Sequence, residues 1–148
     1  MTENEINKIK CELEQIDKLF KSYEVLLNKS KLSNPDLVEI TAIAGVLHSF
    51  YNGIENVFKI IAKFYNDFPS ASKMWHKELL ISMAEQKGKR KAVIKREKIG
   101  SLSDFLAFRH FYRHSYSFHL NWIKIKPLVL KIEELWHLVK MDIIDFIK

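Results

Sequence analysis

Apolar residues recur at intervals of three and four along almost the whole chain, which is the period of a helix that buries one face. Between Ile6 and Leu27 this pattern predicts a first helix over about Glu3–Asn28. Thr2 and Glu5 have the spacing of a capping box at its start, in which two side chains satisfy free backbone amides. No segment has the period-two alternation that indicates a strand.

The segment NKSKLSNP ends the first helix. Asn34 as the cap and Pro35 at the first helical position predict the start of a second helix, because proline there removes only an amide that would be unpaired anyway. This second helix is expected to reach about Tyr65. After a break at NDFPS, a shorter third helix is predicted over about Ala71–Glu85.

Two further helices follow a basic segment that is expected to form a loop. A cap at Ser101 or Ser103, with Asp104, begins the fourth helix. The fifth runs over about Asn121–Ile147, and Pro127 near its start predicts either a later start or a bend. Five helices with short connections predict an all-α fold, an antiparallel helical bundle.

The composition agrees with one helical domain over residues 1–148. Hydrophobic residues at 47% and charged residues at 28% exclude a disordered chain, and the scarcity of glycine and proline argues against a turn-rich all-β fold. The single Cys11 can form neither an internal disulfide nor a thiolate metal cluster, which favours a reducing, cytoplasmic setting. The polar N-terminus is unlike a signal peptide, and no apolar run approaches the about 18–20 residues that span a bilayer.

The net charge of +6 is concentrated in one place. The segment Gln86–Lys98 contains seven basic residues and one acidic residue, so the rest of the chain is balanced. Such a patch predicts a polyanionic partner, with RNA or another nucleic acid before an anionic membrane, or else a solvated mobile loop that aids solubility. The residues expected to contact an RNA backbone are Lys89, Arg90, Lys91, Lys95 and Arg96.

The segment Phe105–Trp122 has the highest density of reactive side chains. It contains three of the six histidines and two of the four arginines, with two tyrosines among them. Such groups are costly to bury unless each finds a partner, and a plain core helix does not need them.

On an ideal helix, Arg109, Arg113 and Tyr116 share one stripe, and His110 and His114 share another. Arg109 and His114 lie about 140° apart around the axis. They can therefore converge on one ligand only if the helix lines a cleft, is distorted, or is completed by a second subunit.

Three interpretations of this cluster are open. His110 and His114 have the i,i+4 spacing of a zinc site, but no third ligand is placed by the sequence. Alternatively the histidines are structural and pair with buried carbonyls or carboxylates, which is the interpretation adopted for His48, His76 and His137. In the third interpretation, Arg and His act together on a phosphodiester, because His titrates near neutrality and Arg binds phosphate in a bidentate fork. This chemistry needs no metal, no thiol and no cofactor.

The octet Arg109–Tyr116 has the form Arg-x4-His-x-Tyr, which resembles the signature of HEPN-domain ribonuclease toxins of the HepT-like group. The blocks Phe50–Lys63 and Met74–Leu80, and the motif segment followed by KPLV, are similar to successive blocks of one HepT-like subfamily. The resemblance covers the predicted helices two to five.

This resemblance implies an all-α homodimer in which both motifs face a shared cleft, and a metal-independent endoribonuclease that leaves a 2′,3′-cyclic phosphate. It also implies a toxin paired with an MNT-type nucleotidyltransferase antitoxin that attaches AMP to the motif tyrosine. Carried over to this chain, Arg109 would bind phosphate, His114 would be the acid/base and Tyr116 would be the AMP acceptor. Glu55 resembles a polar position that faces the motif and would orient Arg109 or His114; the alternative is an ordinary half-exposed glutamate.

Other assignments stay open beside this one. His110 and Arg113 add charge inside the motif and support the site, and His119 is a weaker second candidate for the acid/base. Tyr116 could instead pack at a dimer seam. The competing function is a non-catalytic helical module that binds nucleic acid or a protein and uses the His/Arg cluster as an interface network.

Overall fold

Every regular element is helical in the computed structural model, which describes residues 1–148. The all-α prediction is confirmed, with six α-helices where the periodicity predicted five. The elements are α1 (Glu3–Ser22), α2 (Glu24–Leu32), α3 (Leu37–Phe64), α4 (Trp75–Ser82), α5 (Ile99–Arg113) and α6 (Trp122–Ile147), with single 3₁₀ turns η1 (Arg96–Lys98) and η2 (Ser117–His119).

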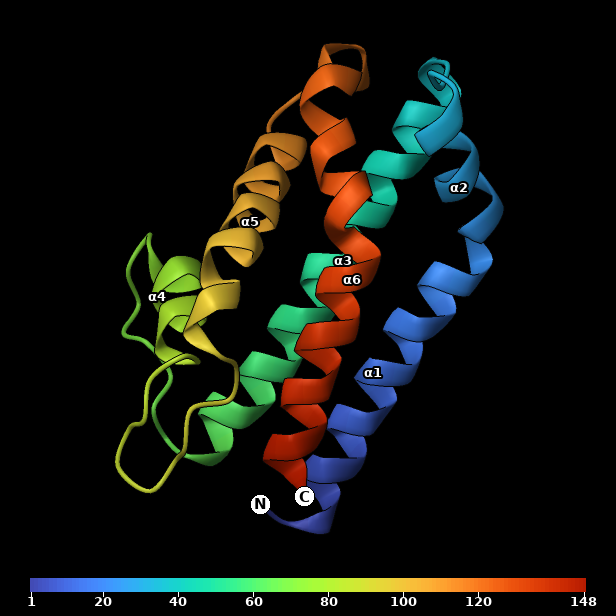
Figure 1. Cartoon of the computed structure of the whole chain (residues 1–148). Helices are drawn as coiled ribbons and strands as arrows, with labels where there is room; N and C mark the ends of the chain where they lie inside the picture. The colour runs from blue at the N-terminus through green and yellow to red at the C-terminus, as the bar shows by residue number, and fades with distance from the viewer.

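Four long helices, α1, α3, α5 and α6, run alternately up and down and form an antiparallel bundle (Figure 1). The short α2 continues beyond the end of α1, and α4 packs against α5 on the outer side of the bundle. Both termini lie at the same end of the molecule (Figure 1). This order leaves α4 and α5 side by side, which places the motif helix next to a second, shorter helix.

Helix α3 lies at the centre of the core. Asp36 caps it, since its carboxylate accepts from the Glu39 amide at 2.8 Å while Glu39 accepts from the Asp36 amide at 3.0 Å. Its length and apolar composition are those of a membrane-crossing helix. Its apolar residues, however, pack against α1, α5 and α6 within one hydrophobic cluster that extends from Ile9 to Ile143.

Gly53 on α3 allows α1 to approach closely. A Cβ at this position would lie 2.6 Å from Cγ1 of Ile16, a distance that packed carbon atoms do not tolerate. Because Ile16 is itself buried, the first helix is part of the same core as the motif helix. The expectation of one domain over residues 1–148 stays a prediction.

The predicted first helix is divided at Tyr23, whose backbone (φ −111°, ψ 13°) leaves the helical region. The hydrophobic pattern continues through this break because α2 also buries a face, including Leu27, so periodicity alone did not reveal it. The capping box at Thr2 was wrong, since its side chain makes no capping hydrogen bond. Asn34 and Pro35 precede α3, and Asp36 is the cap.

The later helix boundaries also differ from the predictions. Helix α4 is confined to Trp75–Ser82, and α5 begins at Ile99, ahead of the expected serine caps. Helix α6 begins at Trp122, where the Asn121 side chain accepts from the Ile123 amide at 3.0 Å, and it continues through Pro127. The most consequential difference is that α5 ends at Arg113, before the motif is complete.

Candidate active site

A cleft of about 550 Å³ lies between α4 and α5. Its walls carry basic and titratable side chains and no acidic residue. These side chains are Lys73, His76, Lys77, Arg109, His110, Arg113 and His114. A concave surface of this charge attracts and concentrates polyanions.

Arg109 forms a buried ion pair with Glu55 of α3. Its Nη1 and Nη2 donate to the two carboxylate oxygens at 3.0 Å each, and Nη1 also donates to Oδ1 of Asn52 at 2.8 Å. Both partners are 2% exposed. The Arg109 guanidinium also lies 5.1 Å from the centroid of the Tyr51 ring, and burial, followed by nearby Glu55, holds the pKa of Tyr51 above its usual range.

This geometry corrects two sequence expectations. Glu55 is not a half-exposed surface residue, because it lies in the core and accepts from the motif arginine. Arg109 was expected to offer its fork to a phosphate, but both terminal nitrogens are occupied by Glu55. Removal of one partner of a buried ion pair strongly destabilises a protein. The guanidinium of Arg109 therefore has a structural role in the fold.

His76, at the start of α4, also contacts Glu55. Its Nδ1 lies 2.8 Å from Oε2 of Glu55 and 2.8 Å from Nη2 of Arg109, and its ring stacks on Trp75 with 3.6 Å between ring centroids. The expectation that His76 pairs with a buried carboxylate agrees with this contact. The sequence did not indicate that the same ring also lines the cleft.

His114 is the C-terminal cap of α5. Its backbone has left the helix (φ −113°), its amide donates to the carbonyl of Phe111 at 3.1 Å, and its side chain is exposed. Its ring lies 4.7 Å, centroid to centroid, from that of His110. His110 and His114 thus meet as their spacing predicted, and no third His, Cys, Asp or Glu joins them to complete a metal site.

Tyr116 follows the end of α5, so the predicted stripe of Arg109, Arg113 and Tyr116 does not exist. The tyrosine is 72% exposed and stacks face to face on Phe118, with 5.4 Å between ring centroids. It does not line the cleft. An aromatic pair on a short surface turn is accessible to another macromolecule without any change in the bundle.

His48 and Asn52 are site neighbours that the sequence did not single out for this role. Asn52 links Arg109 to His48, since its Nδ2 lies 3.3 Å from Nδ1 of His48. Burial lowers the pKa of His48, and the positive charges of Arg113 and Arg109 lower it further. No motif carries this information, because the contact of Asn52 with Arg109 joins α3 to the distant motif helix.

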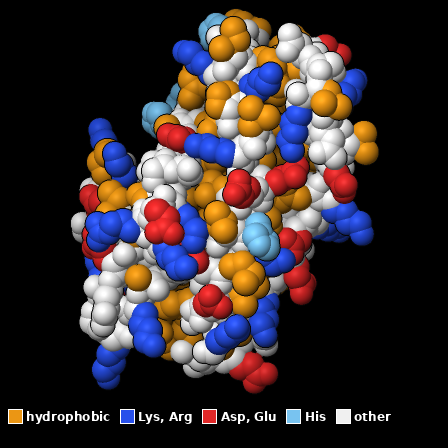
Figure 2. Space-filling model, in the orientation of Figure 1, with side chains coloured by type: hydrophobic (Ala, Val, Ile, Leu, Met, Phe, Trp, Pro, Cys, Tyr) orange, Lys and Arg blue, Asp and Glu red, His pale blue; other side chains and the backbone are white.

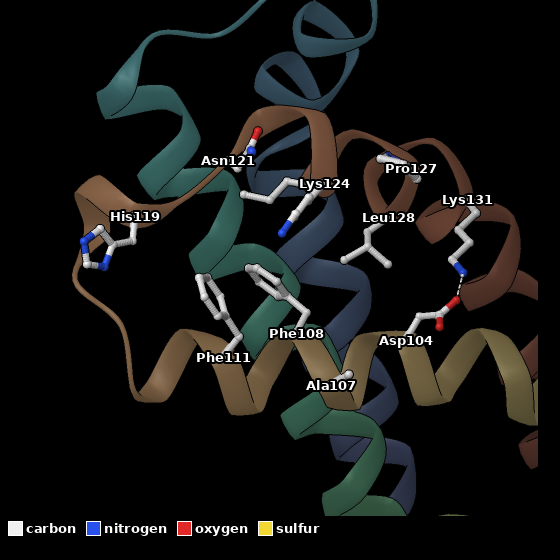
Figure 3. Close-up of a pocket in the computed structure, with 11 residues that line it drawn as sticks. Asp104, Ala107, Phe108, Phe111, His119, Asn121, Lys124, Pro127, Leu128 and Lys131 are labelled. Carbon is white, nitrogen blue, oxygen red and sulfur yellow. Dashed lines mark hydrogen bonds and ion pairs between the residues drawn. The ribbon is translucent and has the colours of Figure 1, made fainter.

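A second, larger cavity of about 680 Å³ lies on another side of α5, against α6 (Figure 3). Phe108 and Phe111 project into it from α5 toward Leu128 of α6, and an ion pair of Asp104 and Lys131 at 2.7 Å lies at one end. Its only His is His119, from the connecting turn, and neither Arg109 nor His114 of the motif lines it. The cleft beside α4, although smaller, therefore has the chemistry of an active site.

The basic segment is anchored rather than mobile. Arg90 is fully buried, donates from Nε to Asp67 at 2.6 Å, and donates to the carbonyl of Ser82 at 3.1 Å. Lys98 is buried against Asp142. The expectation that Arg90 contacts an RNA backbone was wrong, because its guanidinium is enclosed by protein acceptors.

The other basic residues of this segment remain at the surface: Lys87, Lys89, Lys91, Lys95 and Arg96. On the face shown in Figure 2, Lys and Arg side chains are spread among acidic and hydrophobic ones. The excess charge that the sequence placed in one segment is thus divided between buried structural cations and separate surface cations.

An all-α bundle with an Arg-x4-His motif lining a basic cleft defines a HEPN-type helical protein. A family model described as "HepT-like protein" matches residues 42–148, and the chain therefore belongs to the HepT-like family of HEPN-domain proteins. The family is one of toxin-like ribonucleases and suggests a toxin–antitoxin context. No curated protein and no solved structure matches the chain.

Proposed function

We propose that this protein is the toxin of a HEPN/MNT toxin–antitoxin pair and acts in the cytoplasm as a metal-independent endoribonuclease. The observation that carries the proposal is the cleft between α4 and α5, where His114 of the motif shares one cavity with four Lys or Arg side chains and no acidic side chain. RNA is the polyanion expected in this cleft because histidine at neutral pH can move the protons of a ribose phosphodiester.

In the proposed reaction, His114 transfers a proton at the scissile phosphodiester, and the product is a 2′,3′-cyclic phosphate. Lys73, Lys77 and Arg113 are the cations available to hold the phosphate, because the Arg109 fork is engaged by Glu55. The role we assign to Arg109 is therefore to hold Glu55 and the wall of the cleft in place. His110 and Arg113 support the site from the same helix.

The remaining parts of the proposal follow the family. A homodimer would bring two motifs to a shared cleft, and a cognate MNT-type nucleotidyltransferase would neutralise the toxin by attaching AMP to Tyr116. The exposure of Tyr116 and its position two residues after His114 support this acceptor. The added phosphate would place negative charge near the acid/base and compete with RNA.

Cleavage of RNA by the purified protein in the presence of EDTA tests the activity. His114→Ala should abolish cleavage, while His137→Ala, at an exposed position on α6, should leave it unchanged. Arg109→Ala should also abolish it, but by disrupting the buried pair, so its folding must be measured in parallel. Undiminished cleavage by both the His114 and the Arg109 variants would contradict the assignment.

Two further measurements test the toxin context. Mass spectrometry after co-expression with a neighbouring nucleotidyltransferase should detect added AMP on Tyr116. Unmodified Tyr116 in a neutralised toxin would indicate inhibition by complex formation instead.

The competing function, a non-catalytic helical module, is favoured by one observation: both terminal nitrogens of Arg109 are engaged by Glu55 within the fold. Induction of the chain alone separates the two, because a ribonuclease toxin arrests growth and a binding module does not.

A further inference from the structure

We propose that His76, held by Glu55, is the second acid–base residue of the cleft and removes the proton from the ribose 2′-hydroxyl. This inference rests on the proposed ribonuclease activity and adds a residue outside the Arg-x4-His motif. Its basis is the contact between His76 and Glu55, together with the position of His76 on α4, opposite the motif helix across one cavity.

The chemistry requires two proton transfers. The 2′-hydroxyl loses a proton as its oxygen bonds to phosphorus, and the bond from phosphorus to the 5′-oxygen breaks as that oxygen gains a proton. The products are a 2′,3′-cyclic phosphate and a 5′-hydroxyl, with no other reactant consumed. Attack and departure are in line, so the base and the acid stand on opposite sides of the phosphate. Within one protomer, one histidine on α5 cannot fill both positions at once.

His110 is the other histidine of the cleft, but its placement does not suit the second role. Its ring lies against that of His114, on the same side of the cavity, and it has no hydrogen-bond partner that would orient it. His76 approaches from a different helix and is fixed by a buried carboxylate. The two sides of the cleft are therefore represented by His76 and His114.

Two contacts of Nδ1 bear on which nitrogen of His76 carries the proton. Nδ1 lies 2.8 Å from Oε2 of Glu55, which only accepts hydrogen bonds, and 2.8 Å from Nη2 of Arg109, which only donates them. In this proposal the proton is on Nδ1, which then donates to Glu55. Nε2 is then the unprotonated nitrogen, the one able to take a proton from a hydroxyl group. A carboxylate that orients an imidazole in this way also stabilises the imidazolium that forms.

The surroundings restrict the ring further. Trp75 covers one face of the imidazole, and Arg109 fixes Glu55 through both oxygens. Arg109 is accordingly a positioning residue for His76. The charged and titratable groups around His76 are Glu55 and Lys59 of α3, its chain neighbours Lys73 and Lys77, and Arg109, His110, Arg113 and His114 at α5.

The first test uses His76→Asn. The asparagine amide can occupy the place of Nδ1 and donate to Glu55, but it has nothing at the place of Nε2. We expect a folded protein in which single-turnover cleavage falls by about 10²- to 10⁴-fold. The matched control is His137→Asn, outside the cleft, which should cleave at the wild-type rate.

The pH profile separates a proton-transfer role from a structural one. A base must be deprotonated, so wild-type cleavage should rise with pH on the acidic side, and this rise should disappear in His76→Asn. A purely structural role would lower the rate equally at every pH and leave the rise in place, which would overturn the inference.

The second test uses an RNA with sulfur at the bridging 5′ position. A thiolate leaves without a proton, because a thiol is a much stronger acid than an alcohol. This substrate should restore cleavage by His114→Ala, which lacks the acid, but not by His76→Asn, which lacks the base. Equal restoration of both variants would overturn the base assignment.

The failure of this inference can be distinguished from failure of the proposed function. If the His76→Asn variant cleaves at the wild-type rate while His114→Ala is inactive, the role of His76 is rejected and the proposed function stands. Absence of cleavage by the wild-type protein on both substrates would reject the ribonuclease itself.

Discussion

Arg109 and Glu55 face each other through two parallel N–H···O bonds of 3.0 Å, although 54 residues separate them in the chain. The pair joins the motif helix to the central helix of the bundle. It also positions the ring of His76 at the wall of the cleft. Stability and site geometry therefore depend on the same two side chains.

Removal of one partner of this pair should be strongly destabilising. Glu55→Ala leaves the Arg109 charge buried and unpaired, and we expect a decrease of about 3–5 kcal/mol in the free energy of unfolding. The double variant Glu55→Leu/Arg109→Met, which removes both charges, should recover much of that decrease. Urea unfolding measures both values. A double variant that is no more stable than Glu55→Ala would contradict this account of the pair.

The buried cation of the basic segment should behave as a structural residue. Arg90→Met leaves Asp67 and the Ser82 carbonyl without their donor, and we expect destabilisation on the order of 3 kcal/mol. Lys89→Met, one residue away and exposed, should change stability by no more than about 0.5 kcal/mol. Thermal or urea unfolding measures the stability of both variants. A similar loss of stability in the two would show that Arg90 does not hold the segment in place.

The exposed cations of the segment should contribute to RNA binding by pairing with phosphates. Neutralising Lys89, Lys91 and Lys95 together should weaken binding and reduce the slope of log K against log salt by about 0.7 for each phosphate that no longer has a cationic partner. Choice of sequence should hardly change, because cations that pair with phosphates do not read bases. Fluorescence anisotropy at several salt concentrations gives the slope.

The control for this prediction removes the same charge elsewhere. Lys8, Lys10 and Lys18 lie on α1, away from the cleft. The triple alanine variant at these positions should keep the wild-type slope. If both triple variants lower the slope equally, the binding depends on net charge and not on the segment.

Stability should decline in mild acid because of His48. Burial, Arg113 and Arg109 hold its pKa in the folded protein below the ordinary value of 6.5. As the pH falls through that value, the unfolded chain takes up a proton that the folded protein resists, so the free energy of unfolding decreases. His48→Asn retains an acceptor for Asn52 and removes the titration. The difference in stability between about pH 7.5 and about pH 5.5 should be smaller in this variant, and an unchanged difference would exclude His48 as its source.

The close approach of α1 to α3 predicts opposite effects at two glycines of α3. Gly53→Ala places a Cβ against Ile16 and should destabilise the protein by about 1–3 kcal/mol. Gly45→Ala has no atom within 4 Å and should raise stability by up to about 1 kcal/mol through its higher helix propensity. Urea unfolding of the two variants gives the comparison. A stabilised Gly53→Ala would mean that Ile16 moves aside freely.

The helices were predictable because their hydrophobic period is local information, and the motif that carries the family resemblance is contiguous in the chain. The partner of Arg109 was only partly predictable: Glu55 was named, but which motif residue it faces depends on the packing of α3 against α5. The burial of Arg90 was not predictable, since a cation is enclosed only when a distant acceptor, here Asp67, meets it.

The helix end was the other source of error. A shared stripe of Arg109, Arg113 and Tyr116 requires a helix that continues to Tyr116, whereas α5 ends at Arg113. His114 and Tyr116 therefore point in directions that a helical wheel does not describe. Sequence reasoning assigned His76 a structural role for a similar reason: its contact with Glu55 depends on where α4 docks.

The stacked pair of Tyr116 and Phe118 lies on a turn that the bundle does not need for its core. A modifying enzyme that acts there, as proposed, would not have to unfold or distort the protein. Attachment of AMP to Tyr116 would therefore not depend on the stability of the fold. Variants with a weakened core should be modified at Tyr116 as fast as the wild type, for as long as they remain folded. Newly synthesised toxin could then be neutralised at Tyr116 without delay, even if the toxin were only marginally stable.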